Sequence, residues 1–129
     1  MTTLNHTNLS TSNVPELTEF FCSVFDFRLL ERRGDKMSVL RNADGFILTL
    51  MHDKGMVEGQ SYPGVFHVGF LQPTAGAVDR VHRELGVRSY TAPAPAKLLR
   101  GGPPTYGFYC NAPGGVVVEV STMNMATLM

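Results

Sequence analysis

The sequence lacks tryptophan, has no excess charge of either sign and contains only two cysteines in 129 residues. Eleven basic and eleven acidic side chains give a formal net charge of zero, which does not support bulk electrostatic binding to nucleic acid or to an anionic membrane. No apolar run approaches the roughly 20 residues of a spanning helix, and the N-terminus lacks the basic-then-apolar pattern of a signal peptide. We therefore expect a cytoplasmic protein that binds neither nucleic acid nor membrane.

The two cysteines, Cys22 and Cys110, form neither a CxxC motif nor a dense cysteine framework. This usage predicts two reduced thiols and excludes a disulfide scaffold. Hydrophobic residues make up 43% of the chain, which is enough for the core of one domain.

Strand, helix and turn signals follow the same order twice along the chain. The first module, residues 1–53, is expected to hold a strand at 3–11, a helix capped by Asn13 and ended by Asp26, and strands at 27–33, 36–41 and 46–52. Glu16 follows Asn13 at the spacing of a capping box. A polar, glycine-containing linker at 54–64 separates this module from the second, residues 65–122, and a tail follows at 123–129.

The second module repeats this order with strands expected at 65–71, 87–90, 105–110 and 115–122, and a helix that starts at Pro73-Thr74 and closes at Gly86. NADGFILTL at 42–50 resembles NAPGGVVVEV at 111–120, and His6 and His67 occupy matching places. The pattern is an internal duplication of a β-α-β-β-β unit. Each unit is too small to bury both faces of its sheet, so two units must cover one another within the chain or across a dimer.

One carboxylate, Glu119, interrupts the apolar strand VVVEVST at 116–122. A carboxylate inside an apolar sheet should be paired, bound to a metal or facing a wet cavity, and the alternative is a strand-end residue in solvent. His6 and His67 each lie in a short apolar segment of strand character. Two imidazoles and one carboxylate with open coordination positions are suited to Fe(II), and they can also hold Mn, Zn, Co or Ni.

LNHTNL at 4–9, FHVGF at 66–70 and FYCNAPGGVVVEV at 108–120 resemble motifs of the vicinal-oxygen-chelate superfamily. That superfamily includes glyoxalase I, methylmalonyl-CoA epimerase, fosfomycin-resistance thiol transferases, type I extradiol dioxygenases and bleomycin-resistance binding proteins. The resemblance implies an α+β fold in which two β-α-β-β-β modules form curved mixed sheets, as in the glyoxalase, bleomycin-resistance and dihydroxybiphenyl-dioxygenase group. It also implies that His6, His67 and Glu119 ligate a metal and that Tyr109 lines the cup of the sheet.

The fourth metal position of glyoxalase I, where that enzyme has Glu, is Thr49 in this chain. A threonine hydroxyl is a poor base for abstracting a proton next to a carbonyl, and His52 could replace it only through a bulge at the strand end. Tyr109 and Thr49 are the candidate catalytic positions beside the metal. The loop at 97–104 carries Lys97 and Arg100 but not the pattern of the fosfomycin loop, so it is a candidate lid and fosfomycin is not assigned as a substrate.

The resulting hypothesis is a metal-dependent enzyme of the three-ligand type, dioxygenase-like or transferase-like, that acts on a small oxygen-bearing molecule. Fe(II) or Mn(II) is the expected metal, with Zn, Ni or Co as alternatives, and a homodimer is expected, in which His6 of one chain can join His67 and Glu119 of the other. The alternatives are a metal-free small-molecule binding protein of the bleomycin-resistance type and a lyase of the glyoxalase I type. A last interpretation has no site at all, with both histidines satisfied and Glu119 at the rim.

Overall fold

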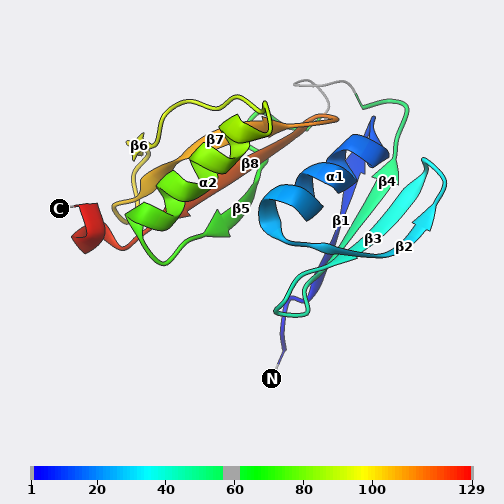
Figure 1. Ribbon diagram of the computed structural model, residues 1–129, viewed down its shortest axis with the longest axis horizontal. Helices are drawn as coiled ribbons and strands as arrows, with labels where there is room; N and C mark the ends of the chain where they lie inside the picture. The colour runs from blue at the N-terminus through cyan, green and yellow to red at the C-terminus, as the bar shows by residue number, and fades with distance from the viewer. Residues whose placement is uncertain (1, 57–61, 129) are drawn as a thin grey trace. The chain divides into compact units, whose positions relative to one another are not determined.

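The computed structural model describes residues 2–56 and 62–128 and divides the chain into two compact units (Figure 1). Unit 1 comprises Met1–Val65 and Ala112–Val116, and unit 2 comprises Phe66–Asn111 and Val117–Met129. Neither helix of the described residues is long and apolar enough to cross a membrane.

Unit 1 contains a four-stranded sheet and one helix. Its elements are β1 (His6–Thr11), α1 (Val14–Phe25), β2 (Arg28–Arg33), β3 (Met37–Arg41) and β4 (Ile47–His52). The strand order is β1-β4-β3-β2, with β1 parallel to β4 and the other pairs antiparallel. All five elements were expected from the sequence to within a few residues.

Helix α1 begins and ends where its capping residues predict. The Asn13 side chain accepts a hydrogen bond from the Glu16 backbone N–H at 3.2 Å, and Asp26 ends the helix in the left-handed conformation at φ 58°. The reciprocal half of the expected capping box is absent, because the backbone N–H of Asn13 donates instead to Thr11 Oγ1 at 3.0 Å. The end of β1 therefore helps to fix the start of α1.

The unit 1 sheet has one buried and one open face. Leu9, Leu40 and Leu50 are fully buried on the face that α1 covers. Because side chains alternate along a strand, His6 and Asn8 of β1 lie on the opposite face, where they are exposed.

Unit 2 repeats the same arrangement. Its elements are β5 (Val68–Leu71), α2 (Ala75–Val87), β6 (Ala96–Lys97), β7 (Tyr106–Ala112), β8 (Val116–Thr122) and a closing 3₁₀ turn, η1 (Met125–Leu128). The strand order is β5-β8-β7-β6, with β5 parallel to β8. Val78, Leu85, Phe108, Val118 and Val120 are buried. The expected α+β architecture of two β-α-β-β-β units is confirmed.

Two expected boundaries in unit 2 are wrong. Helix α2 does not close at Gly86 but continues through Val87 to its cap at Arg88, and Ser89 takes the left-handed conformation at φ 66°. Residues 87–90 therefore form no strand. The edge strand is β6, two residues long and later in the chain, and it pairs antiparallel with β7.

Candidate functional site

Glu119 is buried in the middle of β8, with a side chain only 8% exposed. Its parallel partner across the sheet is Gly69 of β5, and nothing lies within 4 Å of the position where a side chain on Gly69 would begin. The carboxylate thus lies beside a strand that offers it space and no competing side chain. The interpretation of Glu119 as a strand-end residue in solvent is wrong.

Arg100 and Ser121 satisfy both oxygens of this carboxylate. Arg100 donates from Nη1 to Oε1 in a close ion pair and from Nη2 to Oε2 at 3.3 Å. Ser121, two residues along β8 and on the same face, donates from Oγ to Oε2 at 2.6 Å. Within the described residues no buried side-chain nitrogen or oxygen lacks a partner.

His67 and Tyr109 complete the group around Glu119. His67 Nε2 lies 3.4 Å from Glu119 Oε1, and the imidazole packs edge-on against the Tyr109 ring with centroids 5.4 Å apart. Arg100 Nη1 also donates to the Tyr109 hydroxyl at 2.5 Å. The structure therefore brings together three of the residues that the sequence singled out, His67, Tyr109 and Glu119, around one arginine.

The electrostatics of the group keep Glu119 ionised. Burial raises the pKa of Glu119, but hydrogen bonds from Arg100, Ser121 and Tyr109, together with the charge of Arg100, outweigh burial and lower the pKa to about 2. Burial and the neighbouring Glu119 raise the pKa of Tyr109, against the opposite effect of Arg100. At neutral pH the group consists of a carboxylate, a guanidinium and a neutral phenol.

The remaining predicted residues, His6 and Thr49, belong to unit 1. Thr49 of β4 pairs with Asn8 of β1, and His6 lies two residues before Asn8. In the same way, Glu119 of β8 pairs with Gly69 of β5, and His67 lies two residues before Gly69. The register thus places Thr49 at the position in unit 1 that Glu119 holds in unit 2. Bringing His6 to the same metal as His67 and Glu119 stays a prediction.

His52 does not take the place of a fourth ligand through a bulge. It pairs with Thr11 in the last position of β4, and neither the β1–β4 nor the β3–β4 register shifts. Because Thr49 and His52 are three residues apart on a regular strand, their side chains lie on opposite faces.

The donor types and spacing of His67 and Glu119 fit a divalent metal. Two ligand atoms that each lie about 2.0–2.2 Å from a tetrahedral ion are separated by roughly 3.4 Å, and Nε2 and Oε1 are 3.4 Å apart. Arg100, however, now holds the same Oε1. No cluster of three or more His, Cys, Asp or Glu side chains with metal-binding geometry occurs within residues 2–56 and 62–128. A metal on Glu119 must therefore displace Arg100 and recruit further ligands.

Sequence reasoning missed the roles of Ser121 and Arg100. The alternation of β8 already placed Ser121 on the face of Glu119, so its hydrogen bond could have been expected. Arg100 was noted only as one cation of a loop, and nothing in the spacing of that loop indicates a partner 19 residues further along the chain.

Comparisons with known proteins place the chain in one family. The sequence profile of the Glyoxalase/Bleomycin resistance protein/Dioxygenase superfamily matches residues 3–120. A solved structure described as a possible glyoxalase from Bacillus cereus is 35% identical, with 93% of this chain and 98% of that one covered at a TM-score of 0.77.

Two less similar structures share the fold. A lactoylglutathione lyase from Agrobacterium tumefaciens is 15% identical over 95% of this chain and 94% of that one, with a TM-score of 0.71. A glyoxalase/bleomycin resistance protein/dioxygenase from Alicyclobacillus acidocaldarius is also 15% identical, over 98% and 96%, with a TM-score of 0.74. No curated protein matches the chain. The profile match and the 35% identity to the Bacillus cereus protein show that the chain belongs to the Glyoxalase/Bleomycin resistance protein/Dioxygenase superfamily.

Proposed function

We propose that this protein is a divalent-metal-dependent enzyme of the three-ligand type, with His6, His67 and Glu119 as ligands, that acts on a small oxygen-bearing substrate. The observation that supports it is the 3.4 Å spacing of His67 Nε2 and Glu119 Oε1 around a carboxylate whose pKa is lowered to about 2. An ionised carboxylate and an imidazole suit Fe(II) or Mn(II), and Zn, Ni or Co are alternatives.

The residues around Glu119 have distinct roles in this proposal. A bound metal supplies Lewis acidity and open positions for substrate oxygens. Tyr109, neutral and beside His67, donates a hydrogen bond from its phenol to a substrate oxygen. Thr49, at the position in unit 1 that corresponds to Glu119, supplies no carboxylate, and its hydroxyl is a poor general base. This difference favours dioxygenase-like or transferase-like chemistry over a lyase of the glyoxalase I type.

In the metal-free protein Arg100 neutralises the charge of Glu119. Its guanidinium occupies both carboxylate oxygens and the Tyr109 hydroxyl, so the ion pair and metal ligation exclude one another at Oε1. Release of Arg100 would free the acceptor side of the Tyr109 oxygen in the same event, and the phenolic O–H would then turn from Glu119 to a substrate oxygen.

Titration of the chelator-treated protein with Mn(II), followed by calorimetry and by melting temperature, tests the ligand set. A metal that binds only the native state raises the melting temperature in the parent protein. We expect His67→Ala, Glu119→Gln and His6→Ala each to weaken Mn(II) binding at least about 100-fold, whereas His52→Ala, the matched control, leaves it unchanged. Equal Mn(II) affinity in the parent protein and in His67→Ala would refute the metal site. Unchanged Mn(II) affinity in His6→Ala would exclude only His6 from the ligand set.

The reaction type and the assembly need separate measurements. Ring-cleavage colour from Fe(II)-loaded protein, catechols and air, absent without oxygen, would support the dioxygenase-like reaction. No turnover would favour the transferase-like reaction or the binding protein. Light scattering of the purified protein tests the proposed homodimer, and a monomeric mass would contradict it.

The second candidate is a metal-free small-molecule binding protein. The observation that favours it is that Arg100 and Ser121 already satisfy Glu119 without a metal. It predicts tight binding of a planar or cationic compound that the chelator EDTA does not change, together with no Mn(II) binding in the titration above.

A further inference from the structure

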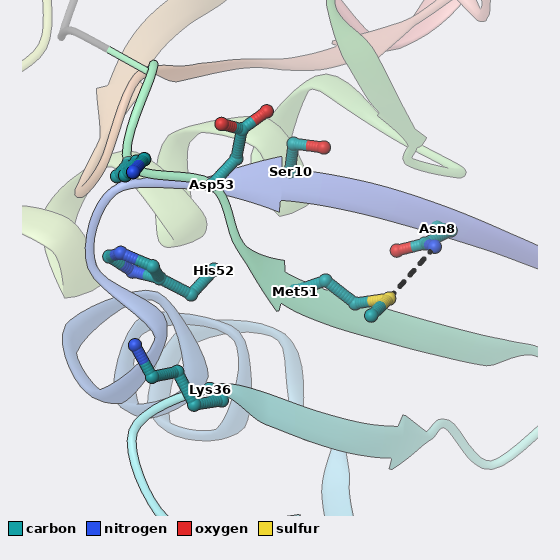
Figure 2. Close-up of a pocket in the computed structure, with 7 residues that line it drawn as sticks. Asn8, Ser10, Lys36, Met51, His52 and Asp53 are labelled. Carbon is teal, nitrogen blue, oxygen red and sulfur yellow. Dashed lines mark hydrogen bonds between the residues drawn. The ribbon is translucent and has the colours of Figure 1, made fainter.

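Unit 1 contains a cavity of about 620 Å³ around the end of β1 and β4 (Figure 2). Asn8 and Ser10 of β1 and Met51 of β4 line it, and Asn8 donates to the Met51 sulfur at 3.2 Å. Asn8 and Ser10 follow His6 at two-residue steps and line the cavity from its strand face, whereas His52, the partner of Thr11, reaches the cavity from the other face at the end of β4. Its volume is sufficient for a small organic ligand.

The side chains of Lys36, His52 and Lys54 also line this cavity. The His52 backbone N–H donates to the Lys36 carbonyl at 2.8 Å, which fixes the start of β3 beside the end of β4. In Figure 2 the Lys36 ammonium and the His52 ring extend on the same side of the strand end. Neither Lys36 nor Lys54 forms an ion pair with a described residue.

The acidic residue at the cavity, Asp53, forms no ion pair with these lysines within the described residues. Its carboxylate accepts a hydrogen bond from the Gly55 backbone N–H at 2.9 Å, within the turn that follows β4, and in Figure 2 it points away from Lys36. Helix α1 begins at Val14, three residues after β1 ends, so the positive end of its dipole lies at this same end of the unit. Two ammonium groups against one carboxylate therefore give the lining a net positive charge.

We propose that this cavity binds a small organic anion, a carboxylate or a phosphate ester. Lys36 and Lys54 pair with the oxyanion, the hydroxyl of Ser10 and the amide of Asn8 donate to its oxygens, and Met51 contacts its carbon skeleton. Bringing two ammonium groups to one cavity is unfavourable, and a bound anion offsets that repulsion. That this anion is the substrate of the metal centre rests on the proposed function, whereas the binding itself does not.

Calorimetric titration of the chelator-treated protein with inorganic phosphate, 2-phosphoglycolate and succinate tests this site. We expect saturable binding of at least one probe, weakened about tenfold by Lys36→Gln or Lys54→Gln and about 100-fold by both together. Lys97→Gln removes an exposed lysine of β6 in unit 2 and should leave the affinity unchanged. Tighter binding of the phosphorylated probe assigns a phosphate ester, and tighter binding of succinate assigns a carboxylate.

Two results would overturn the proposal: no saturable binding of any probe, or equal affinity in the parent protein and the double lysine variant. Far-ultraviolet circular dichroism and the melting temperature of the double variant establish that it is folded, because both lysines are exposed. Glu119→Gln separates this site from the metal centre. It should abolish Mn(II) binding and keep anion binding, so failure of either proposal is seen without the other.

Discussion

Replacing Arg100 by glutamine should make the metal-free protein less stable and its metal binding tighter. The substitution removes the guanidinium that holds both oxygens of Glu119, while Ser121 still donates to Oε2 at 2.6 Å. The folded protein then contains a buried carboxylate without its counter-ion, and an uncompensated buried charge is destabilising. A divalent cation would meet the same carboxylate without a competitor.

The size of both effects follows from the pKa of Glu119. Its fall from an ordinary value of 4.5 to about 2 corresponds to roughly 3 kcal/mol in favour of the folded, ionised state. Arg100, Ser121 and Tyr109 share this stabilisation against burial, and the Arg100 side chain is 37% exposed, so solvent screens its part. We therefore expect Arg100→Gln to lower the free energy of unfolding by about 1–2 kcal/mol and to tighten the apparent Kd for Mn(II) about 5- to 30-fold.

The pH dependence of stability gives a second readout in the metal-free protein. A lowered pKa contributes stability that is fully present above the ordinary value of 4.5 and is lost as pH falls through the folded value of about 2. Arg100→Gln raises the pKa of Glu119, because it removes the ion pair that lowers it. The difference in stability between the two proteins should thus be full at neutral pH and should shrink as the pH falls below about 5.

Urea unfolding with a chelator present and Mn(II) calorimetry measure the two effects. Arg88→Gln is the matched control, because Arg88 pairs with Glu84 at 2.9 Å on the surface of α2, with both side chains about 40% exposed. It should change stability by no more than about 0.5 kcal/mol and leave Mn(II) affinity unaltered. The reasoning is refuted if Arg100→Gln binds Mn(II) no tighter than the parent while Glu119→Gln abolishes binding.

Two further predictions concern the scaffold. Gly114→Ala should lower the free energy of unfolding by about 2–4 kcal/mol in urea unfolding, because a Cβ at this left-handed residue (φ 81°) would lie 1.8 Å from Thr11 Oγ1. Gly34→Ala, also left-handed (φ 52°) but with open space, should lose only about 1 kcal/mol, and equal losses would contradict the steric argument. The Tyr106 hydroxyl donates to Asp79 Oδ1 at 2.6 Å, and this hydrogen bond together with burial raises the pKa of Tyr106 to about 12. The stabilisation from this contact is therefore full below pH 10 and is lost as the pH rises through about 12. Asp79→Asn should bring the tyrosinate absorbance transition of Tyr106 back toward pH 10, and an unmoved transition would show that the hydrogen bond does not set this pKa.

Local rules predicted the first unit well because local contacts decide it. The apolar stripe of α1 and the caps at Asn13 and Asp26 are short-range features, and each appears where the sequence places it. One prediction was wrong, the hydrogen bond from the Asn13 backbone N–H to the Glu16 side chain. That N–H donates instead to Thr11 at the end of β1. That contact depends on how β1 meets α1, which helix periodicity does not describe.

The errors in unit 2 have a physical cause in weak local signals. Gly86 predicts the end of α2, but a glycine inside a helix costs only about 1 kcal/mol. The helix instead extends one residue further, and the Arg88 backbone N–H donates to the Glu84 carbonyl at 3.2 Å. Strand β6 has two exposed residues, Ala96 and Lys97, and neither β-branching nor alternation marks it. Its pairing with β7, rather than its own sequence, makes it a strand.

The residues of the candidate site also differ in how well the sequence predicts them, according to whether they lie on strands or in a loop. His67 and Glu119 lie on or beside regular strands, so strand character and the internal repeat were sufficient to propose them together, whereas Tyr109 was proposed from the family resemblance. Arg100 lies in a loop of glycine and proline, where no period relates a side chain to its partner. The sequence therefore predicted which group would be buried and charged, but not which cation would neutralise it.

The two copies differ at the position of the buried carboxylate. In unit 1 the position equivalent to Glu119 is Thr49, and its neighbours across the sheet are Asn8 and Val39, which offer no positive charge. Neither of these two strand partners could pair with a glutamate at this half-buried position. In unit 2 the same position is next to Gly69 and within reach of Arg100, so a buried carboxylate is stable even before a metal binds. The two copies keep the same register, but only the second carries a carboxylate at this position, where Arg100 pairs with it.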